Sequence, residues 1–187
     1  MNYPQVAAFL KDGKVAVIPT DTIYGIVGSA LNEKTVEEIY RLRKRATDKP
    51  MIILISSIDD LNYFNIQLSE KQTKFLQKNW PNPLSVVLPV NSEKFKYLHR
   101  GKNSLAFRMP KDQQLLGILK ETGPLVAPSA NYEDEKPSET IKIAKDYFGD
   151  SVDLYIDKGQ IKSEPSTIIE LASSGKVKVL RDGQYRV

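Results

Sequence analysis

Residues 41–55 read Arg41-Leu42-Arg43-Lys44-Arg45-Ala46-Thr47-Asp48-Lys49-Pro50-Met51-Ile52-Ile53-Leu54-Ile55. The last five are apolar and predict a buried strand, and the residues before them close a predicted helix over 33–45. The helix dipole stabilises cations near a helix C-terminus, which accounts for Arg41 and Lys44. Lys49 lies beyond the predicted helix, just before the predicted strand, so the helix dipole does not explain its presence. The stretch therefore predicts an anion-binding site, since Arg and Lys at a strand end can pair with phosphate or carboxylate.

Predicted helices and strands alternate along most of the chain, and strands dominate its end. Helices are expected at 4–11, 33–45, 58–61, 69–79, 112–122 and 138–149. Strands are expected at 15–18, 51–55, 84–88, 103–109, 125–127, 152–156, 167–171 and 177–180. Four polar residues suit helix N-caps, namely Asn32, Ser69, Asp112 and Ser138. This order predicts one α/β domain over residues 1–187, with a twisted mixed β-sheet flanked by helices in two or three layers.

The composition excludes several classes of protein and of site. Hydrophobic residues make up 41% and charged residues 27% of the 187, as in an ordinary soluble globule. No apolar run approaches the roughly 18 residues of a membrane span, and no signal peptide is recognisable, so we expect a cytoplasmic protein without membrane contact. The chain has no cysteine and one histidine, which excludes disulfides, thiolate chemistry and His-rich metal sites. That histidine, His99, lies in the polar stretch 97–102 and is expected at the surface.

Four groups of polar side chains lie at or beside the ends of predicted strands. They are residues 19–22, Arg43 with Arg45 and Lys49, Ser104 with Arg108, and Ser129 with Asn131. Alternation places Ser104 and Arg108 on one face of the strand 103–109, a pattern that a solvated edge strand explains equally well. Hydroxyls in such places also serve ordinary turns. Their recurrence at strand ends nevertheless favours one ligand site.

The ligand class stays open at this point. A net charge of +4 suits an anionic ligand or RNA without choosing between them. The common nucleotide fingerprints GxxxxGK[ST] and GxGxxG are both absent, so a nucleotide would be held by scattered side chains.

Seven blocks of sequence, in order, resemble the signature of YrdC-like proteins. They are Pro19-Thr20-Asp21-Thr22-Ile23-Tyr24-Gly25, Arg43-Lys44-Arg45 with Lys49-Pro50, Trp80-Pro81-Asn82-Pro83-Leu84, Arg108-Met109-Pro110, Ser129-Ala130-Asn131, Pro165-Ser166-Thr167-Ile168-Ile169-Glu170-Leu171 and Leu180-Arg181-Asp182-Gly183. The resemblance covers nearly the whole chain. It implies the YrdC-like fold with a concave basic surface, in the single-domain bacterial form.

The same resemblance implies an activity, that of a threonylcarbamoyl-AMP synthase. This nucleotidyltransferase converts L-threonine, bicarbonate and ATP into L-threonylcarbamoyladenylate and pyrophosphate. The product supplies the t6A modification at tRNA position 37 through a threonylcarbamoyl-transfer complex, so tRNA and that complex are implied partners. Mg²⁺ is expected to arrive with ATP, held by phosphate oxygens and water, with no metal ligand from the protein.

Individual roles also follow from the resemblance. The implied ATP contacts are Arg43, Arg45, Lys49, Ser104, Ser129, Ser138 and Arg181. The implied threonine contacts are Thr22, Leu54, Arg108, Ala127 and Ser166. The implied catalytic residues are Arg45, Lys49, Ser129 and Asn131.

The sequence departs from the family pattern in three places. Arg43 replaces a leading Lys, which exchanges a compact ammonium for a planar fork. Glu133 and Asp134 stand where relatives usually carry Ser-Gly, and Leu54 stands where many carry a His near threonine.

Two other functions fit parts of the sequence. The basic surface would also serve a non-catalytic RNA-binding or translation-related module, whose RNA affinity would fall steeply with salt. The second alternative function is that of a carbamoyl-AMP-forming domain of hydrogenase-maturation proteins. Proteins with such domains are longer than this chain and carry zinc-finger cysteines, which this chain lacks. Adenylation is favoured because it needs no enzyme nucleophile: a threonine carbamate attacks the α-phosphorus, and positioned cations supply the catalysis.

Overall fold

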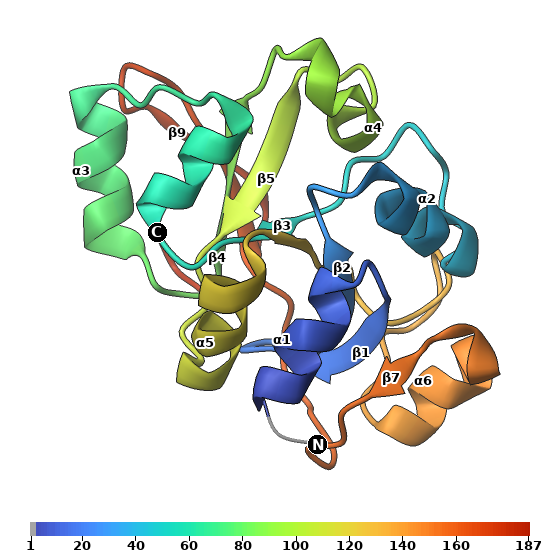
Figure 1. The fold of residues 1–187 in the computed structure, drawn as a ribbon. Helices are drawn as coiled ribbons and strands as arrows, with labels where there is room; N and C mark the ends of the chain where they lie inside the picture. Colours follow the sequence, from blue (N-terminus) through green and yellow to red (C-terminus); the bar gives the residue numbers. More distant parts are fainter. Residues whose placement is uncertain (1–2) are drawn as a thin grey trace.

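A single mixed sheet forms the centre of the protein in a computed structural model that describes residues 3–187 (Figure 1). Its strands are β1 (Ala16–Pro19), β2 (Tyr24–Ser29), β3 (Ile53–Leu54), β4 (Leu84–Pro89), β5 (Ser104–Arg108), β6 (Leu125–Val126), β7 (Leu154–Tyr155), β8 (Thr167–Leu171) and β9 (Val177–Arg181). Their order across the sheet is β7-β1-β2-β6-β3-β5-β4-β8-β9. The pairs β1/β7, β3/β5 and β4/β8 are parallel and the other neighbours antiparallel, which confirms the predicted mixed α/β sheet.

Helices flank this sheet, and three of them begin at the predicted caps. The helical segments are α1 (Tyr3–Lys11), α2 (Glu33–Leu42), η1 (Ile58–Phe64), α3 (Glu70–Asn79), η2 (Glu93–Phe95), α4 (Lys96–His99), α5 (Gln113–Thr122), α6 (Ile141–Phe148) and η3 (Gly149–Ser151). Asn32, Ser69 and Asp112 each accept a hydrogen bond from a backbone N–H in the first turn of the helix that follows. These bonds satisfy donors that have no partner within the helix.

The helices cover the two faces of the sheet unequally. On one face, α1 and α5 lie side by side and close a small apolar core over β1, β2, β3 and β6 (Figure 1). On the other face, α2, η1, α3, α4 and α6 contribute to a larger core that also takes side chains from β4, β5 and β8. The α1/α5 face of β4, β5 and β8 stays accessible: Val87, Ala106 and Ile168 are only half buried and Glu170 is exposed. The protein therefore has an open half-sheet beside a covered one.

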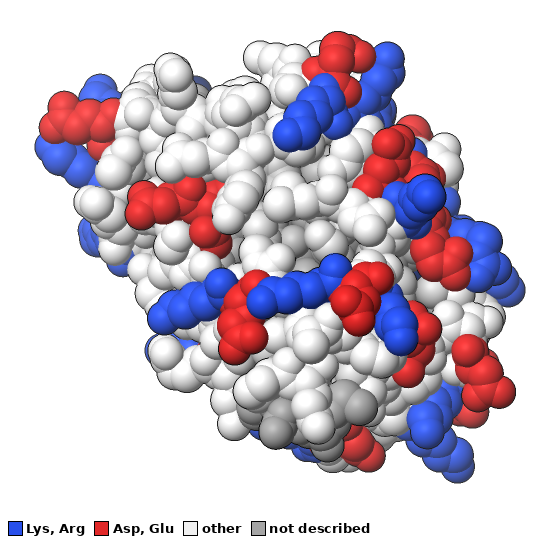
Figure 2. All heavy atoms as spheres, in the orientation of Figure 1, with Lys and Arg blue, Asp and Glu red and all other residues white. Residues whose placement is uncertain are grey.

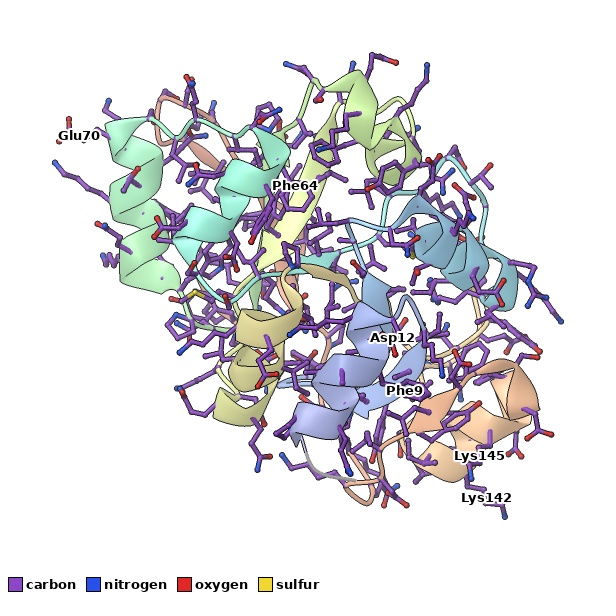
Figure 3. The ribbon with its side chains drawn as sticks, viewed as in Figure 1. Phe9, Asp12, Phe64, Glu70, Lys142 and Lys145 are labelled. Carbon is purple, nitrogen blue, oxygen red and sulfur yellow. The ribbon has the colours of Figure 1, made fainter. Side chains whose placement is uncertain are left out.

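Packing in the larger core sets the direction of the side chains on β5. Phe64 points inward from η1, whereas Glu70 at the start of α3 points outward (Figure 3). The ring of Phe64 lies 5.0 Å from that of Phe107 and 5.2 Å from that of Phe95. Because neighbouring residues of a strand point to opposite faces, this packing turns Arg108 toward the α1/α5 face.

The stretch 41–55 departs from its prediction at both ends. The helix α2 ends at Leu42 rather than Arg45, because Lys44 has a left-handed backbone (φ 51°) that a right-handed helix cannot continue. The strand that follows is limited to Ile53–Leu54. The cations after Leu42 therefore lie on a loop that leads into the sheet.

The alternative of a solvated edge strand over 103–109 is wrong. β5 lies inside the sheet, between β3 and β4, and Arg108 is buried. On that face Arg108 borders a pocket, described below, whereas Ser104 and Ala106 lie on the accessible half-sheet and are only half buried.

Two further expectations are wrong. His99 is buried, 1% exposed, at the end of α4, where its Nδ1 accepts the N–H of Gly101. Ser138 is not a helix cap: Thr140 caps α6, and the Ser138 hydroxyl donates to the carbonyl of Ala130. In both places a polar side chain is buried and forms a hydrogen bond with a backbone group of a nearby residue in the same loop region.

Sequence patterns also failed to indicate the strand β2. Its glycines and the preceding Thr-rich motif are typical of a loop. The reason for Gly28 is packing: a Cβ there would lie 2.4 Å from the Thr35 methyl group and 3.1 Å from Ile39 Cδ1. The helix α2 can approach β2 because Gly28 has no side chain.

Candidate active site

A small pocket lies where five separate segments of the chain meet. It encloses about 40 Å³. Five predicted site residues line it, namely Thr22, Arg108, Ala127, Ser129 and Ser166. Thr20, Ile52 and Pro165 also line it, although sequence reasoning assigned them no role. Thr20 and Pro165 belong to blocks of the family resemblance, which could have drawn attention to them.

Arg108 is a buried, fixed guanidinium that faces this pocket. It is 4% exposed, and its Nη1 donates to Thr22 Oγ1 at 3.2 Å. Its Nη2 lies 3.2 Å from Asp21 Oδ1 and 3.5 Å from Thr20 Oγ1. Burial lowers the pKa of Arg108, and the Asp21 carboxylate acts in the opposite direction. A guanidinium held in one orientation at a pocket is suited to bind a carboxylate or phosphate in a fork.

A second guanidinium approaches the pocket from β9. Arg181 donates through Nη2 to the carbonyl of Ser166 at 2.7 Å, and Ser166 Oγ lies 2.9 Å from Ser85 Oγ. Burial lowers the pKa of Arg181, and repulsion from Arg108 lowers it further. An anion between two such cations would relieve their repulsion, so the pair favours an anionic ligand.

Arg43 supports the far wall of the pocket from behind. Its Nε donates to the carbonyl of Asn131 at 3.1 Å, and its Nη2 donates to Ser129 Oγ at 3.3 Å. Burial, with repulsion from Arg45, lowers the pKa of Arg43 to about 10, so it is charged at neutral pH. Two of its donor groups are engaged within the protein, and its contact with the pocket runs through Ser129.

Arg45 and Lys49 converge on the carboxylate of Glu133. Lys49 Nζ lies 3.0 Å and Arg45 Nη1 3.6 Å from Glu133 Oε1. Arg45 also donates through Nε and Nη2 to the carbonyls of Lys49 and Pro50, which fixes the loop. The hydrogen bond from the Ala46 N–H, and then that from Lys49, lower the pKa of Glu133. Sequence comparison marked Glu133 only as a departure from the family, without a contact.

Ser104 and Leu54 lie away from both the pocket and the cations described above. Ser104 lines a neighbouring groove of about 390 Å³ over the open half-sheet. Four residues of extended strand place it about 13 Å from Arg108. Leu54 is fully buried in the small core under α1 and α5, and Ile52 lines the pocket instead.

Asn131 and Ser138 shape the loop beside the pocket. Asn131 Nδ2 donates to the carbonyl of Glu135 at 2.9 Å, and the Ser138 hydroxyl donates to that of Ala130. Both side chains are buried. The structure thus shows them holding the loop that carries Glu133.

Charge elsewhere on the surface is mixed. The face in Figure 2 carries Lys and Arg interspersed with Asp and Glu, without one continuous basic area. Within residues 3–187, no three His, Cys, Asp or Glu side chains come close enough to hold a metal ion. In the same range, no helix has the length and hydrophobicity to cross a membrane.

Comparison with known proteins gives a consistent family. The Sua5/YciO/YrdC family model, described as telomere recombination, matches residues 8–183. A threonylcarbamoyl-AMP synthase of Pyrococcus abyssi is 32% identical over 180 residues, which cover 95% of this chain and 52% of that protein. A threonylcarbamoyl-AMP synthase of Bacillus subtilis is 34% identical over 144 residues, which cover 74% of this chain and 41% of that protein. The chain thus spans about half the length of these curated relatives.

Solved structures share the fold. The crystal structure of Pyrococcus abyssi Sua5 complexed with L-threonine matches with a TM-score of 0.87 and 30% identity, over 97% of this chain and 54% of that chain. Escherichia coli YciO matches with a TM-score of 0.83 and 20% identity, over 97% of this chain and 88% of that chain, which shows the fold alone. The resemblance to YrdC-like proteins is confirmed, and this chain belongs to the Sua5/YciO/YrdC family.

Proposed function

We propose that this chain is a threonylcarbamoyl-AMP synthase, which converts L-threonine, bicarbonate and ATP into L-threonylcarbamoyladenylate and pyrophosphate. The observation that carries the proposal is the meeting of Arg108, Ser129 and Ser166 in one pocket, from segments far apart in sequence. Two relatives carry the synthase name, and a solved relative is described as complexed with L-threonine.

Threonine is the ligand that we assign to the pocket. In this proposal the Arg108 fork binds the threonine carboxylate, and the hydroxyls of Thr22 and Ser166 bind its polar groups. Ala127 and Ile52 border the side chain. A pocket of about 40 Å³ suits a small molecule. In this proposal the threonine amine is directed toward the open half-sheet.

ATP is assigned to the cations and to the open half-sheet. The triphosphate lies against Arg45, Lys49 and Ser129, and the nucleoside extends toward Ser104 in the neighbouring groove. Arg181 neutralises charge between the two substrates. Mg²⁺ enters as part of the substrate, coordinated by phosphate oxygens and water.

The reaction requires position and charge rather than an enzyme nucleophile. The threonine amine first combines with bicarbonate, with loss of water, to give a carbamate. A carbamate oxygen attacks the α-phosphorus, the bond from that phosphorus to the oxygen that bridges it to the β-phosphorus breaks, and pyrophosphate leaves. Negative charge moves onto the leaving group in the transition state, where Arg45 and Lys49 stabilise it. Asn131 contributes by holding the loop that carries Ser129.

The setting of the reaction is part of the same proposal. We place the protein in the cytoplasm, where its product passes to a threonylcarbamoyl-transfer complex that modifies tRNA. A purely RNA-binding role would not use Arg108 as a ligand contact, because it is buried at the pocket and RNA phosphates require cations on an accessible surface.

The test is a reconstitution with ATP, bicarbonate and labelled threonine. We expect pyrophosphate release that requires all three, together with a labelled nucleotide. Lys120→Gln on the exposed side of α5 is the matched control for surface charge and should behave as wild type. Pyrophosphate release that is independent of threonine contradicts the proposal. Salt-sensitive RNA binding without threonine-dependent ATP consumption would favour the RNA-binding module.

A further inference from the structure

The pair Arg45 and Lys49 already holds an anion that the protein itself supplies. Glu133 Oε1 lies 3.0 Å from Lys49 Nζ and 3.6 Å from Arg45 Nη1, and Glu133 Oε2 accepts the Ala46 N–H at 2.7 Å. An ammonium, a guanidinium and a backbone N–H around one carboxylate form the donor set that proteins also use for phosphate oxygens. The Glu133 side chain is 14% exposed, so it is set into the protein surface.

The loop around Glu133 is fixed on both sides. The backbone N–H of Glu133 donates to the carbonyl of Arg43 at 2.8 Å. Lys44 Nζ lies 3.8 Å from the centre of the Tyr132 ring, a cation–π contact next to Glu133 in sequence. Asn131 closes the same loop through the carbonyls of Tyr132 and Glu135. These contacts hold the Glu133 carboxylate next to Arg45 and Lys49.

We propose that Glu133 is an internal competitor for nucleotide phosphate, which occupies the Arg45–Lys49 site in the free protein and leaves when a polyphosphate binds. The identification of the ligand rests on the proposed function, whereas the competition itself requires only an anion of the phosphate class. Two anions cannot share these donors, because like charges at such a distance repel strongly.

Competition of this kind sets an affinity threshold. The apparent affinity equals the intrinsic affinity multiplied by the fraction of time in which the site is vacant. This factor is the same for every anion that binds there. Inorganic phosphate, with few other contacts, stays unbound, whereas a triphosphate with further contacts still binds. After the reaction, the returning Glu133 carboxylate helps to displace pyrophosphate.

The test measures binding of inorganic tripolyphosphate by calorimetry, without threonine or bicarbonate. Glu133→Gln keeps the size of the side chain and an acceptor for the Ala46 N–H but removes the charge. Glu135→Gln is the matched control, since it removes the same charge from an exposed position of the same loop. We expect Glu133→Gln to bind tripolyphosphate and inorganic phosphate about tenfold more tightly than wild type, within the usual range of coupling between two sites. Glu135→Gln should stay within about twofold.

Two results would overturn the inference. One is unchanged or weaker binding by folded Glu133→Gln, as judged by its thermal transition. The other is an equal gain in Glu135→Gln, which would indicate a general charge effect. Should Glu133→Gln fail to fold, Glu133→Asp gives a second test, because the shorter carboxylate withdraws from Lys49 and the gain should be several-fold.

The outcome is separable from that of the proposed function. A protein without threonine-dependent pyrophosphate release would lose the synthase assignment, while the tripolyphosphate comparison would still decide the role of Glu133. Conversely, an active synthase in which Glu133→Gln binds no more tightly would keep its function and lose the internal competitor.

Discussion

Arg43 donates through Nη2 to the hydroxyl of Ser129 at 3.3 Å, although the two residues are 86 positions apart in sequence. The guanidinium follows the last turn of α2, and the hydroxyl lines the pocket. This contact ties the end of a helix to the wall of the site. Stability of the fold and geometry of the site therefore depend on the same side chain.

Arg43→Ala is expected to lower the free energy of unfolding by about 3 kcal/mol. The carbonyl of Asn131 and the hydroxyl of Ser129 lose a buried, charged donor, at roughly 1–3 kcal/mol for each unsatisfied group. Urea unfolding measures the loss. Arg41→Ala is the control, because Arg41 is exposed and its ion pair with Glu38 lies on the surface. The unfolding midpoint of this variant should not move. Equal midpoints for the two variants would contradict the supporting role of Arg43.

Arg108→Lys is expected to raise the KM for threonine and lower kcat/KM by about 10²–10³-fold, in line with the loss of one positioned donor in an active site. A lysine keeps the charge but cannot form the fork that reaches Thr22 and Asp21 together. The KM for ATP should change little. Steady-state kinetics with each substrate varied in turn separates the effects, and a selective rise in the ATP KM would argue against threonine in this pocket.

Two glycines should respond to alanine with opposite signs. Gly28→Ala is expected to destabilise the protein by about 1–3 kcal/mol, because the new methyl group would overlap Thr35 and Ile39 of α2. Gly117 lies in the exposed middle of α5, where the added Cβ would meet no side chain and no other segment within 4 Å, so Gly117→Ala should stabilise by about 0.5–1 kcal/mol. Thermal and urea unfolding of both variants provide the comparison. Destabilisation by Gly117→Ala would contradict the packing described for α5.

The stabilising effect of Glu133 should depend on pH. Its pKa in the folded protein is lowered from 4.5, by the Ala46 N–H and then by Lys49. A carboxyl group with a lowered folded-state pKa stabilises the protein above the unfolded-state pKa and loses this effect as pH falls through the folded-state value. The Tm of wild type should therefore exceed that of Glu133→Gln at pH 7, and the difference should shrink below pH 4.5. A difference that persists unchanged in acid, with Glu135→Gln as reference, would rule out the ion pairs as its source.

Patterns in the sequence predicted the parts of the fold that depend on local chemistry. The caps at Asn32, Ser69 and Asp112 are local hydrogen bonds, and the sequence places each of them correctly. The strand β2 was beyond such reasoning, since its glycines reflect contact with α2 rather than a turn. The burial of His99 could not be predicted for the same reason, because it depends on how a segment of mostly polar sequence packs against the rest of the protein.

The site shows a similar division. Alternation along β5 indicated that Ser104 and Arg108 share a face, but it could not show that one lies in the pocket and the other in a separate groove. The acids that pair with the cations, Asp21 and Glu133, were not predicted as contacts. Pairing across distant segments requires the tertiary structure, and one sequence carries no direct signal for it.

Removal of Arg45 should lower the Tm, whereas removal of Lys49 should not, although both side chains are assigned to the leaving phosphates. The Arg45 side chain is 19% exposed and donates to the carbonyls of Lys49 and Pro50, whereas that of Lys49 is 51% exposed. Lys49→Ala should therefore reduce turnover by about 10²–10³-fold while the thermal transition stays near that of wild type. Arg45→Ala should reduce turnover similarly and also lower the Tm, because two loop carbonyls lose their donor.

Turnover and Tm, measured side by side for the two variants, check this difference. Lys74→Ala is the control, because Lys74 is an exposed lysine on α3 that pairs with Glu70 on the surface. If Arg45→Ala kept both its Tm and its rate of adenylate formation, Arg45 would belong neither to the loop nor to the site. If Lys49→Ala instead unfolded at a markedly lower temperature, the ion pair between Lys49 and Glu133 would serve to stabilise the fold rather than to form part of a phosphate-binding site.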